Sequence, residues 1–186
     1  MAKLKNFVTP AGTLSWPWIA KPDTRYNAEG VFKTSMVLSE DAAKPLMAMC
    51  EEVYVAEYGA AKLKKANMPW DEEADANGNP TGNIVFKFKS KRQPKLYDSK
   101  GKVIAKVLKV ASGTTAKIAT ALNPYSTGIN TGVSLYLNDI QILELVEFGG
   151  GAGGMFKAEE GFDFVDDGKP DLQQTEPDTS DESGDF

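Results

Sequence analysis

The 186 residues allow one domain with an appendage or two very small domains. They contain no run of 18 apolar residues, and the first residues lack the apolar segment of a signal peptide, so we expect no membrane span and no export. The single cysteine, Cys50, excludes an internal disulfide and indicates a reducing cytoplasm, while the lack of histidine argues against an enzyme or a zinc site, and no cofactor is expected.

The net charge of −5 conceals two oppositely charged parts. Residues 1–157 carry 20 Lys and Arg against 15 Asp and Glu, whereas residues 158–186 carry 11 acids and one lysine. Hydrophobic residues are also sparse in 158–186, so this part is predicted to be a disordered acidic tail. The Gly-rich stretch 149–157 then forms a linker, which leaves one folded domain over residues 1–148.

The first strands are predicted to be short and bounded by turn residues. Lys3–Pro10 indicates one strand, and Thr13–Ala20 indicates a second, in which Leu14, Trp16 and Trp18 fall on the same side. The proline between the tryptophans cannot donate to a sheet, so the strand lies at an edge or ends there. The two tryptophans either pack in the core or stack on nucleic-acid bases.

A third strand over Val31–Leu38 is followed by the only predicted helix. Ser39 supplies an N-cap hydroxyl, and the next two residues are acids, which suits the positive end of a helix dipole. The 3.6-residue period then continues to Lys65. The side chains on this period are Leu46, Met49, Cys50, Val53 and Glu57. The sulfur-containing residues are interpreted as packing residues and not as metal ligands.

The polar stretch Asn67–Gly82 is predicted to be a flexible loop. Glu73, Asp75 and Asn77 imitate the start of a calcium loop, but Ile84 occupies the position at which that motif needs a carboxylate. A nuclease with a metal held by this loop is an alternative, although its carboxylates would come from one loop and not from several strands. Those carboxylates are Asp71, Glu72, Glu73 and Asp75.

The segment Asn83–Val110 has the strongest pattern in the sequence. Ile84, Phe86 and Phe88 alternate with lysines, so one face can enter the core while the other faces water. Asp98–Gly101 has the composition of a turn, which predicts a hairpin of two antiparallel strands. Nine cations and a single acid lie between residues 87 and 109.

So one-sided a charge indicates a surface that binds an anion. The alternative is an exposed sheet edge that uses lysine to resist aggregation. The candidate anion-binding residues are Lys87, Lys89, Lys91, Arg92, Lys100, Lys102, Lys106 and Lys109.

The last elements are a strand over Ala116–Leu122, a loop over Asn123–Gly128 and a long strand over Val133–Val146. Short strands separated by turn residues, with one inserted helix, predict a mostly-β fold in the form of a small barrel or sandwich. Beyond them the acidic tail ends in Asp185-Phe186. A solubilising tail would explain the acids but not the phenylalanine.

A basic β-rich body, a Gly-rich hinge and acids followed by Phe resemble the bacteriophage single-stranded DNA-binding proteins with an OB-fold core. The stretches Asn123–Tyr125 and Gly132–Asn138 are also similar to such a phage family. The resemblance implies an OB-fold-like antiparallel barrel that binds single strands across one face. It also implies a tail that recruits replication or recombination proteins, such as a polymerase, helicase or nuclease. The tail residues implied are Asp181, Glu182, Asp185 and Phe186.

The resulting hypothesis is a sequence-independent protein that protects single-stranded DNA during phage replication, recombination and repair. The candidate stacking residues are Trp16, Trp18, Tyr97 and Tyr125. An alternative is an interaction or assembly protein whose acidic tail mimics DNA to occupy a partner's site, although such a protein has no need for the cations of the body. The sequence leaves open whether the chain forms a homo-oligomer.

Overall fold

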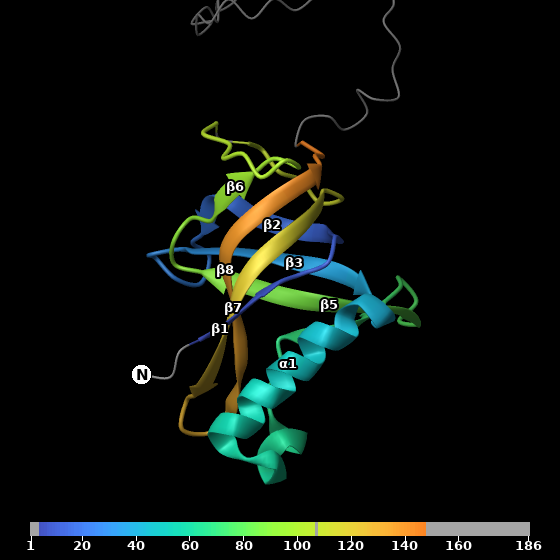
Figure 1. Cartoon of the computed structure of the whole chain (residues 1–186), viewed down its shortest axis with the longest axis vertical. Helices are drawn as coiled ribbons and strands as arrows, with labels where there is room; N and C mark the ends of the chain where they lie inside the picture. The colour runs from blue at the N-terminus through green and yellow to red at the C-terminus, as the bar shows by residue number, and fades with distance from the viewer. Residues whose placement is uncertain (1–3, 107, 148–186) are drawn as a thin grey trace, which may run out of the picture.

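The computed structural model describes residues 4–106 and 108–147 (Figure 1). The predicted linker, the tail and the tail residues Asp181, Glu182, Asp185 and Phe186 therefore lie outside the described residues. The described chain is mostly β-sheet with one α-helix, as predicted. Its elements are β1 (Lys5–Val8), β2 (Gly12–Asp23), β3 (Val31–Ser39), α1 (Glu40–Tyr58), the 3-10 helix η1 (Ala60–Lys65), β4 (Trp70–Ala74), β5 (Pro80–Ser90), β6 (Lys95–Tyr97), β7 (Thr115–Ser126) and β8 (Thr131–Glu144).

Five strands pair in a closed circuit. β2 pairs with β3, β3 with β5, β5 with β8, β8 with β7, and β7 returns to β2. The pairing of β5 with β8 is parallel and sets Phe88 opposite Leu135. β6 also runs parallel to β8, so the prediction of a wholly antiparallel sheet was wrong. β1 and β4 extend the circuit at its sides, on β7 and β5 respectively.

The alternating pattern of β5 places its side chains as the sequence predicts. Ile84, Phe86 and Phe88 are buried in the core, whereas Lys87 and Lys89 are exposed on the opposite face. Alternation on a strand assigns each side chain to one of two faces, and the hydrophobic effect then decides which face turns inward. Phe86 and Phe88 are therefore core residues, as predicted.

The predicted helix is confirmed at its start and shorter at its end. The Ser39 hydroxyl accepts the Ala42 N–H at 3.4 Å. The α-helix stops at Tyr58 because Gly59 turns out with a φ of 85°, and the following residues form η1 instead of continuing to Lys65. No helix within the described ranges is long and apolar enough to span a membrane.

One face of α1 packs on the sheet. Its buried residues are Ala43, Leu46, Cys50 and Tyr54. Leu46 and Cys50 were predicted on this face, whereas Glu57 is exposed and its assignment was wrong. Burial raises the pKa of the Cys50 thiol to about 12, which fits a packing residue.

Two predicted loops contain strand residues. Within Asn67–Gly82, β4 pairs with β5, and the Trp70 ring lies 5.9 Å from the ring of Phe86. Backbone pairing and this aromatic contact outweigh the low strand propensity of the three acids in β4. Similarly, β7 continues to Ser126 because it pairs with β8 over that length, so the predicted loop Asn123–Gly128 was wrong over its first four residues.

The predicted hairpin over Asn83–Val110 is confirmed only at its turn. The Asp98 carboxylate accepts the N–H groups of Lys100 and Lys102, each at 2.9 Å, and Tyr97 pairs with Val103. β5 instead pairs with β3 and β4, which precede it in the chain, and with β8, which follows later.

Candidate nucleic-acid interface

A groove of about 770 Å³ opens on the face of the circuit that carries the β5 lysines. It is lined from β2, β3, β5, β7 and β8, from the loop between β2 and β3, and from the segment just before β4. The lining also includes Phe88 and Leu135, both of which are buried. The polar and aromatic side chains used below are Trp16, Trp18, Arg25, Lys33, Lys87, Lys89 and Tyr125.

An irregularity in β2 turns Trp16 out of the sheet. The register with β3 shifts between Ser15 and Trp18, and Trp16 has a φ of 50°, which non-glycine residues rarely adopt. The Trp16 N–H leaves the ladder and donates to Ser112 Oγ at 2.9 Å. Leu14 is therefore buried while Trp16 is 80% exposed, so the prediction that they share a side was wrong. Core packing is excluded for Trp16, and Trp18 is half-buried.

A buried carboxylate holds two cations at the groove. The Asp23 side chain is 3% exposed and accepts from Arg25 Nη2 at 2.9 Å and from Lys33 Nζ at 2.5 Å. These hydrogen bonds, first from Arg25 and then from Lys33, hold the pKa of Asp23 well below its ordinary value. The Arg25 guanidinium also lies 5.1 Å from the centre of the Trp18 ring, a cation–π distance.

The cations of β3 and β5 lie side by side on the same face of the sheet. Lys33 is directly opposite Lys89, and Ser35 is opposite Lys87, so all four belong to the face that carries the groove. Lys87 also forms an ion pair with Asp71 of β4. Arg25 and Lys33 were not among the predicted DNA-binding residues, and the signal that could have found Lys33 is its place on the solvent side of a strand that pairs with β5.

Tyr125 enters the groove at the far end of β7, opposite Gly132 of β8. The Asn67 N–H donates to the Thr131 carbonyl at 2.9 Å, and its own carbonyl accepts the Val133 N–H at 3.0 Å. A Cβ atom on Gly132 would lie 2.2 Å from the Asn67 oxygen, so only glycine allows this approach. The approach brings the two residues after Asn67 to the groove wall.

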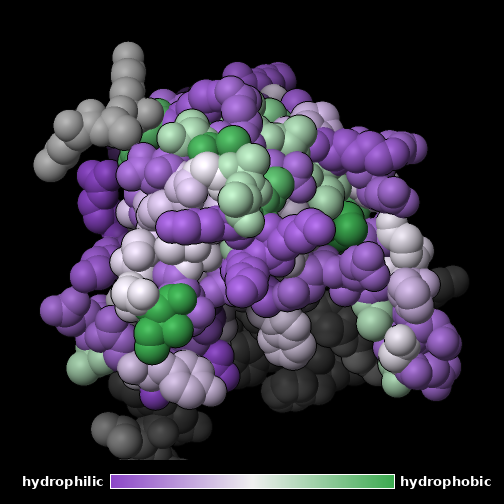
Figure 2. Space-filling model, turned by 90° about the horizontal axis from the view of Figure 1, so that it is seen from below, coloured by the Kyte–Doolittle hydropathy of each residue, from purple (hydrophilic) through white to green (hydrophobic). Residues whose placement is uncertain are grey.

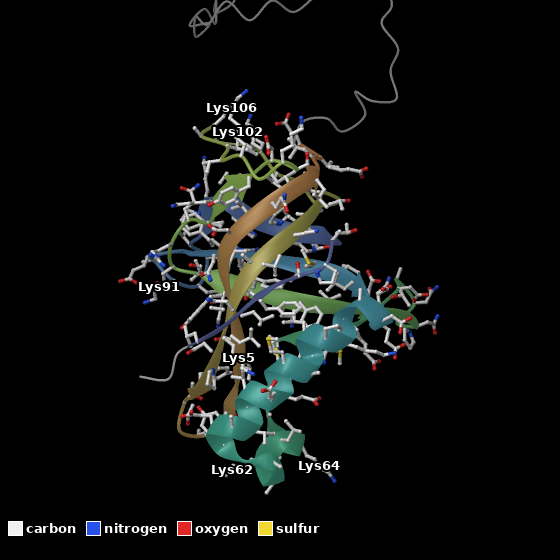
Figure 3. All side chains as sticks on the ribbon, in the orientation of Figure 1. Lys5, Lys62, Lys64, Lys91, Lys102 and Lys106 are labelled. Carbon is white, nitrogen blue, oxygen red and sulfur yellow. The ribbon has the colours of Figure 1, made fainter. Side chains whose placement is uncertain are left out.

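Of the twelve residues predicted for DNA binding, five line the groove: Trp16, Trp18, Lys87, Lys89 and Tyr125. The other seven lie outside its lining: Lys91, Arg92, Tyr97, Lys100, Lys102, Lys106 and Lys109. In Figure 3, Lys102 and Lys106 lie at one end of the molecule, and Lys91 projects from another side. The prediction of one charged hairpin surface was therefore wrong, because its cations point to several sides. The role of each residue in binding remains a prediction.

Two of the four carboxylates considered for a nuclease, Glu73 and Asp75, form hydrogen bonds within the β4–β5 hairpin. Glu73 accepts from the Thr81 hydroxyl at 2.6 Å and from the Asn83 amide at 2.8 Å. The Asp75 carboxylate accepts two backbone N–H groups of the hairpin turn, at 2.8 and 2.9 Å. Within residues 4–106 and 108–147, no group of three or more His, Cys, Asp or Glu side chains could hold a metal ion.

Three comparisons with known proteins point to the same family. The single-stranded DNA-binding protein of Escherichia phage T7 is 29% identical over an alignment that covers 81% of this chain and 80% of that protein. The crystal structure of gp2.5, a single-stranded DNA-binding protein encoded by bacteriophage T7, matches with a TM-score of 0.64 at 24% identity, over 88% of this chain and 100% of that one.

The bacteriophage Enc34 single-stranded DNA-binding protein in complex with ssDNA matches in fold, with a TM-score of 0.60 at 13% identity over 77% of this chain and 89% of that one. A model of the family described as "Enterobacter phage Enc34, ssDNA-binding protein" matches residues 6–173. This match spans most of the sequence, and the chain therefore belongs to that bacteriophage family.

Proposed function

We propose that this chain binds single-stranded DNA with little sequence preference, and that the groove is its binding site. The observation that carries the proposal is the gathering of three aromatic and four cationic side chains in one groove. Aromatic rings stack on any base, whereas cations displace counterions from phosphates whatever the sequence. Bases in a duplex are already stacked on each other, so the rings favour single strands.

The fold and the relatives support this proposal. We interpret the five-strand circuit as an OB-type barrel, in which the face of the second and third strands binds oligonucleotides. β3 and β5 hold those places in the circuit, and both line the groove. The T7 relative carries single-stranded DNA binding in its name, and the Enc34 relative was solved with ssDNA.

We further propose that the chain protects single strands during phage DNA replication, recombination and repair. In this proposal the acids and Phe186 of the tail recruit replication or recombination proteins. An apolar ring surrounded by charge suits a small pocket on such a partner. The alternative, a tail that mimics DNA in a partner's site, does not explain a body with its own cationic and aromatic groove.

The binding site is tested by fluorescence anisotropy of a labelled oligothymidylate and of a duplex of equal length, over a salt series. We expect the parent chain to prefer the single strand. Lys87→Glu with Lys89→Glu should weaken binding and reduce the salt slope by ~0.7 for each phosphate that the variant no longer neutralises. Lys100→Glu with Lys102→Glu makes the same charge change outside the groove and should have the smaller effect. Equal reductions of affinity in both double variants would place the binding site elsewhere.

The tail is tested separately. Removing residues 158–186 should raise the affinity for single strands at low salt, because a tethered acidic segment competes for the basic groove at an effective concentration of about millimolar. Phe186→Ala keeps every charge, so we expect it to leave DNA affinity unchanged and to reduce binding to purified phage replication proteins. Unchanged affinity after truncation would contradict the competition, and full partner binding by Phe186→Ala would contradict the anchor.

A further inference from the structure

We propose that η1 carries a second phosphate-binding site that continues the groove beyond Tyr125. The site consists of Lys62, Lys64 and Lys65, which we call the η1 lysines. The proposal rests on the proposed function, since it assigns the path of the strand after it leaves the groove. None of these residues belongs to the cation-rich segment between residues 87 and 109.

The geometry of η1 turns all three lysines outward. Leu63 packs against the hydrophobic core, which fixes the rotation of the short helix. A 3-10 helix has three residues per turn, so Lys62 and Lys65 lie one above the other, about 6 Å apart along the axis. Lys62, Lys64 and Lys65 are exposed, and none of them forms an ion pair with another described residue.

Two sets of hydrogen bonds fasten η1 to the end of the groove. The buried Tyr54 hydroxyl donates to the Lys62 carbonyl at 3.3 Å and lies 2.7 Å from the Thr131 hydroxyl, with which it shares a hydrogen bond. Asn67, two residues after Lys65, lines the groove and is bonded on both sides to β8. The η1 lysines are therefore held next to the groove wall and not on a loose segment.

The surroundings of η1 also suit an extended single strand. η1 lies beside the tip of the β7–β8 hairpin, at the end of the molecule opposite β6 (Figure 1). Figure 2 views the molecule from this end, where hydrophilic side chains cover most of the surface. Ile129, in the hairpin turn, is 95% exposed and offers an apolar surface to an unstacked base.

A second set of lysines provides a matched control. Lys100, Lys102 and Lys106 are also exposed, and like the η1 lysines they lie outside the groove lining. Figure 3 shows Lys102 and Lys106 at the opposite end of the molecule from Lys62 and Lys64. Replacing either set removes three positive charges, so any difference between the two variants reports position and not net charge.

The test measures binding of oligothymidylates of increasing length, from about 4 to about 16 nucleotides, the range of site sizes found for OB folds. The full chain is compared with a variant carrying Lys62→Ala, Lys64→Ala and Lys65→Ala and with the control variant carrying alanine at the three opposite lysines. For the longest strand, we expect the η1 variant to bind on the order of tenfold more weakly at low salt, with a salt slope reduced by about 2, which corresponds to three phosphates. The shortest strand should bind to it as to the parent.

The outcomes separate this proposal from the proposed function. If the parent chain binds no oligothymidylate, the proposed function of the groove itself is contradicted. If the parent binds but the η1 variant matches it at every length, the extension is overturned. A reduction of affinity that is equal at all lengths, or equal in the control variant, also overturns it, because the lysines would then act within the groove or through net charge. Circular dichroism of both variants checks that the fold is retained.

Discussion

Replacing Trp16 by alanine should weaken DNA binding by at least as much free energy as it takes from the stability of the fold. The side chain is 80% exposed, so it buries only about a fifth of its surface. A tryptophan buries at most about 150–250 Å², so the change in buried area is about 40 Å², or ~1 kcal/mol of unfolding free energy at 25 cal/mol per Å². One stacked base contributes ~1–3 kcal/mol, which predicts a dissociation constant about 5- to 150-fold higher.

The unusual backbone at this position supplies a second variant. Trp16 has a φ of 50°, which strains any residue with a Cβ atom by roughly 1–2 kcal/mol, and glycine avoids this strain. Trp16→Gly should therefore be at least as stable as Trp16→Ala, although glycine loses about 0.5–1 kcal/mol through its freedom in the unfolded chain. Because both variants lack the ring, both should bind DNA equally weakly. Trp16→Tyr keeps an aromatic face and should retain most of the affinity.

Anisotropy of a dye-labelled oligothymidylate is the suitable assay, because intrinsic fluorescence changes when a tryptophan is removed. Denaturant unfolding of the same preparations gives the stabilities. Parent-like affinity in Trp16→Ala would refute the stacking role. A large decrease in stability with unchanged affinity would show that the ring packs in the fold. Full affinity in Trp16→Gly alone would show that the backbone, and not the ring, determines binding.

Two further predictions concern the frame of the groove, and denaturant unfolding checks both. Gly132→Ala should lower the free energy of unfolding by roughly 1–3 kcal/mol, because its Cβ would lie 2.2 Å from the Asn67 oxygen, and it should also weaken DNA binding. Gly128→Ala has no neighbour within 4 Å and should lower the free energy of unfolding only by the ~1 kcal/mol of a left-handed alanine. Equal losses of stability in the two variants would refute the steric argument. Because the pKa of Asp23 is depressed in the folded state, its ionised form stabilises the fold above about pH 4, and this stability is lost as the pH falls towards the lower folded pKa. The stability difference between the parent and Asp23→Asn should therefore shrink in acid. A difference that stays constant with pH would contradict this.

The sequence predicts those features of the site that depend on one element of secondary structure alone. On β5, the alternation of Phe86 and Phe88 with Lys87 and Lys89 is enough to assign both faces, because a strand has only two. The start of α1 at Ser39 is equally local, since a cap needs only its own hydroxyl and the following N–H groups. Both predictions are confirmed in the structure.

The remaining parts depend on which strands pair, and composition does not encode that directly. Lys33 joins the groove only because β3 lies against β5, and Arg25 joins it because Asp23 holds both cations. Lys100 and Lys102 lie outside the groove because their turn follows β6, which pairs with β8 instead of continuing alongside β5. The position of Trp16 depends on a backbone irregularity that simple alternation does not predict.

The parallel pairing of β5 with β8 has a consequence for how the protein is made. Hairpins such as β7–β8 join neighbouring segments and can form early, whereas the β5–β8 pair joins Phe88 to Leu135 across β6 and β7. Contacts between distant residues form late, because closing a long loop costs chain entropy. The groove needs side chains from Trp16 to Leu135, so it cannot be complete until β8 has left the ribosome. Chains released before that point would lack the groove and could not compete with finished copies for single strands.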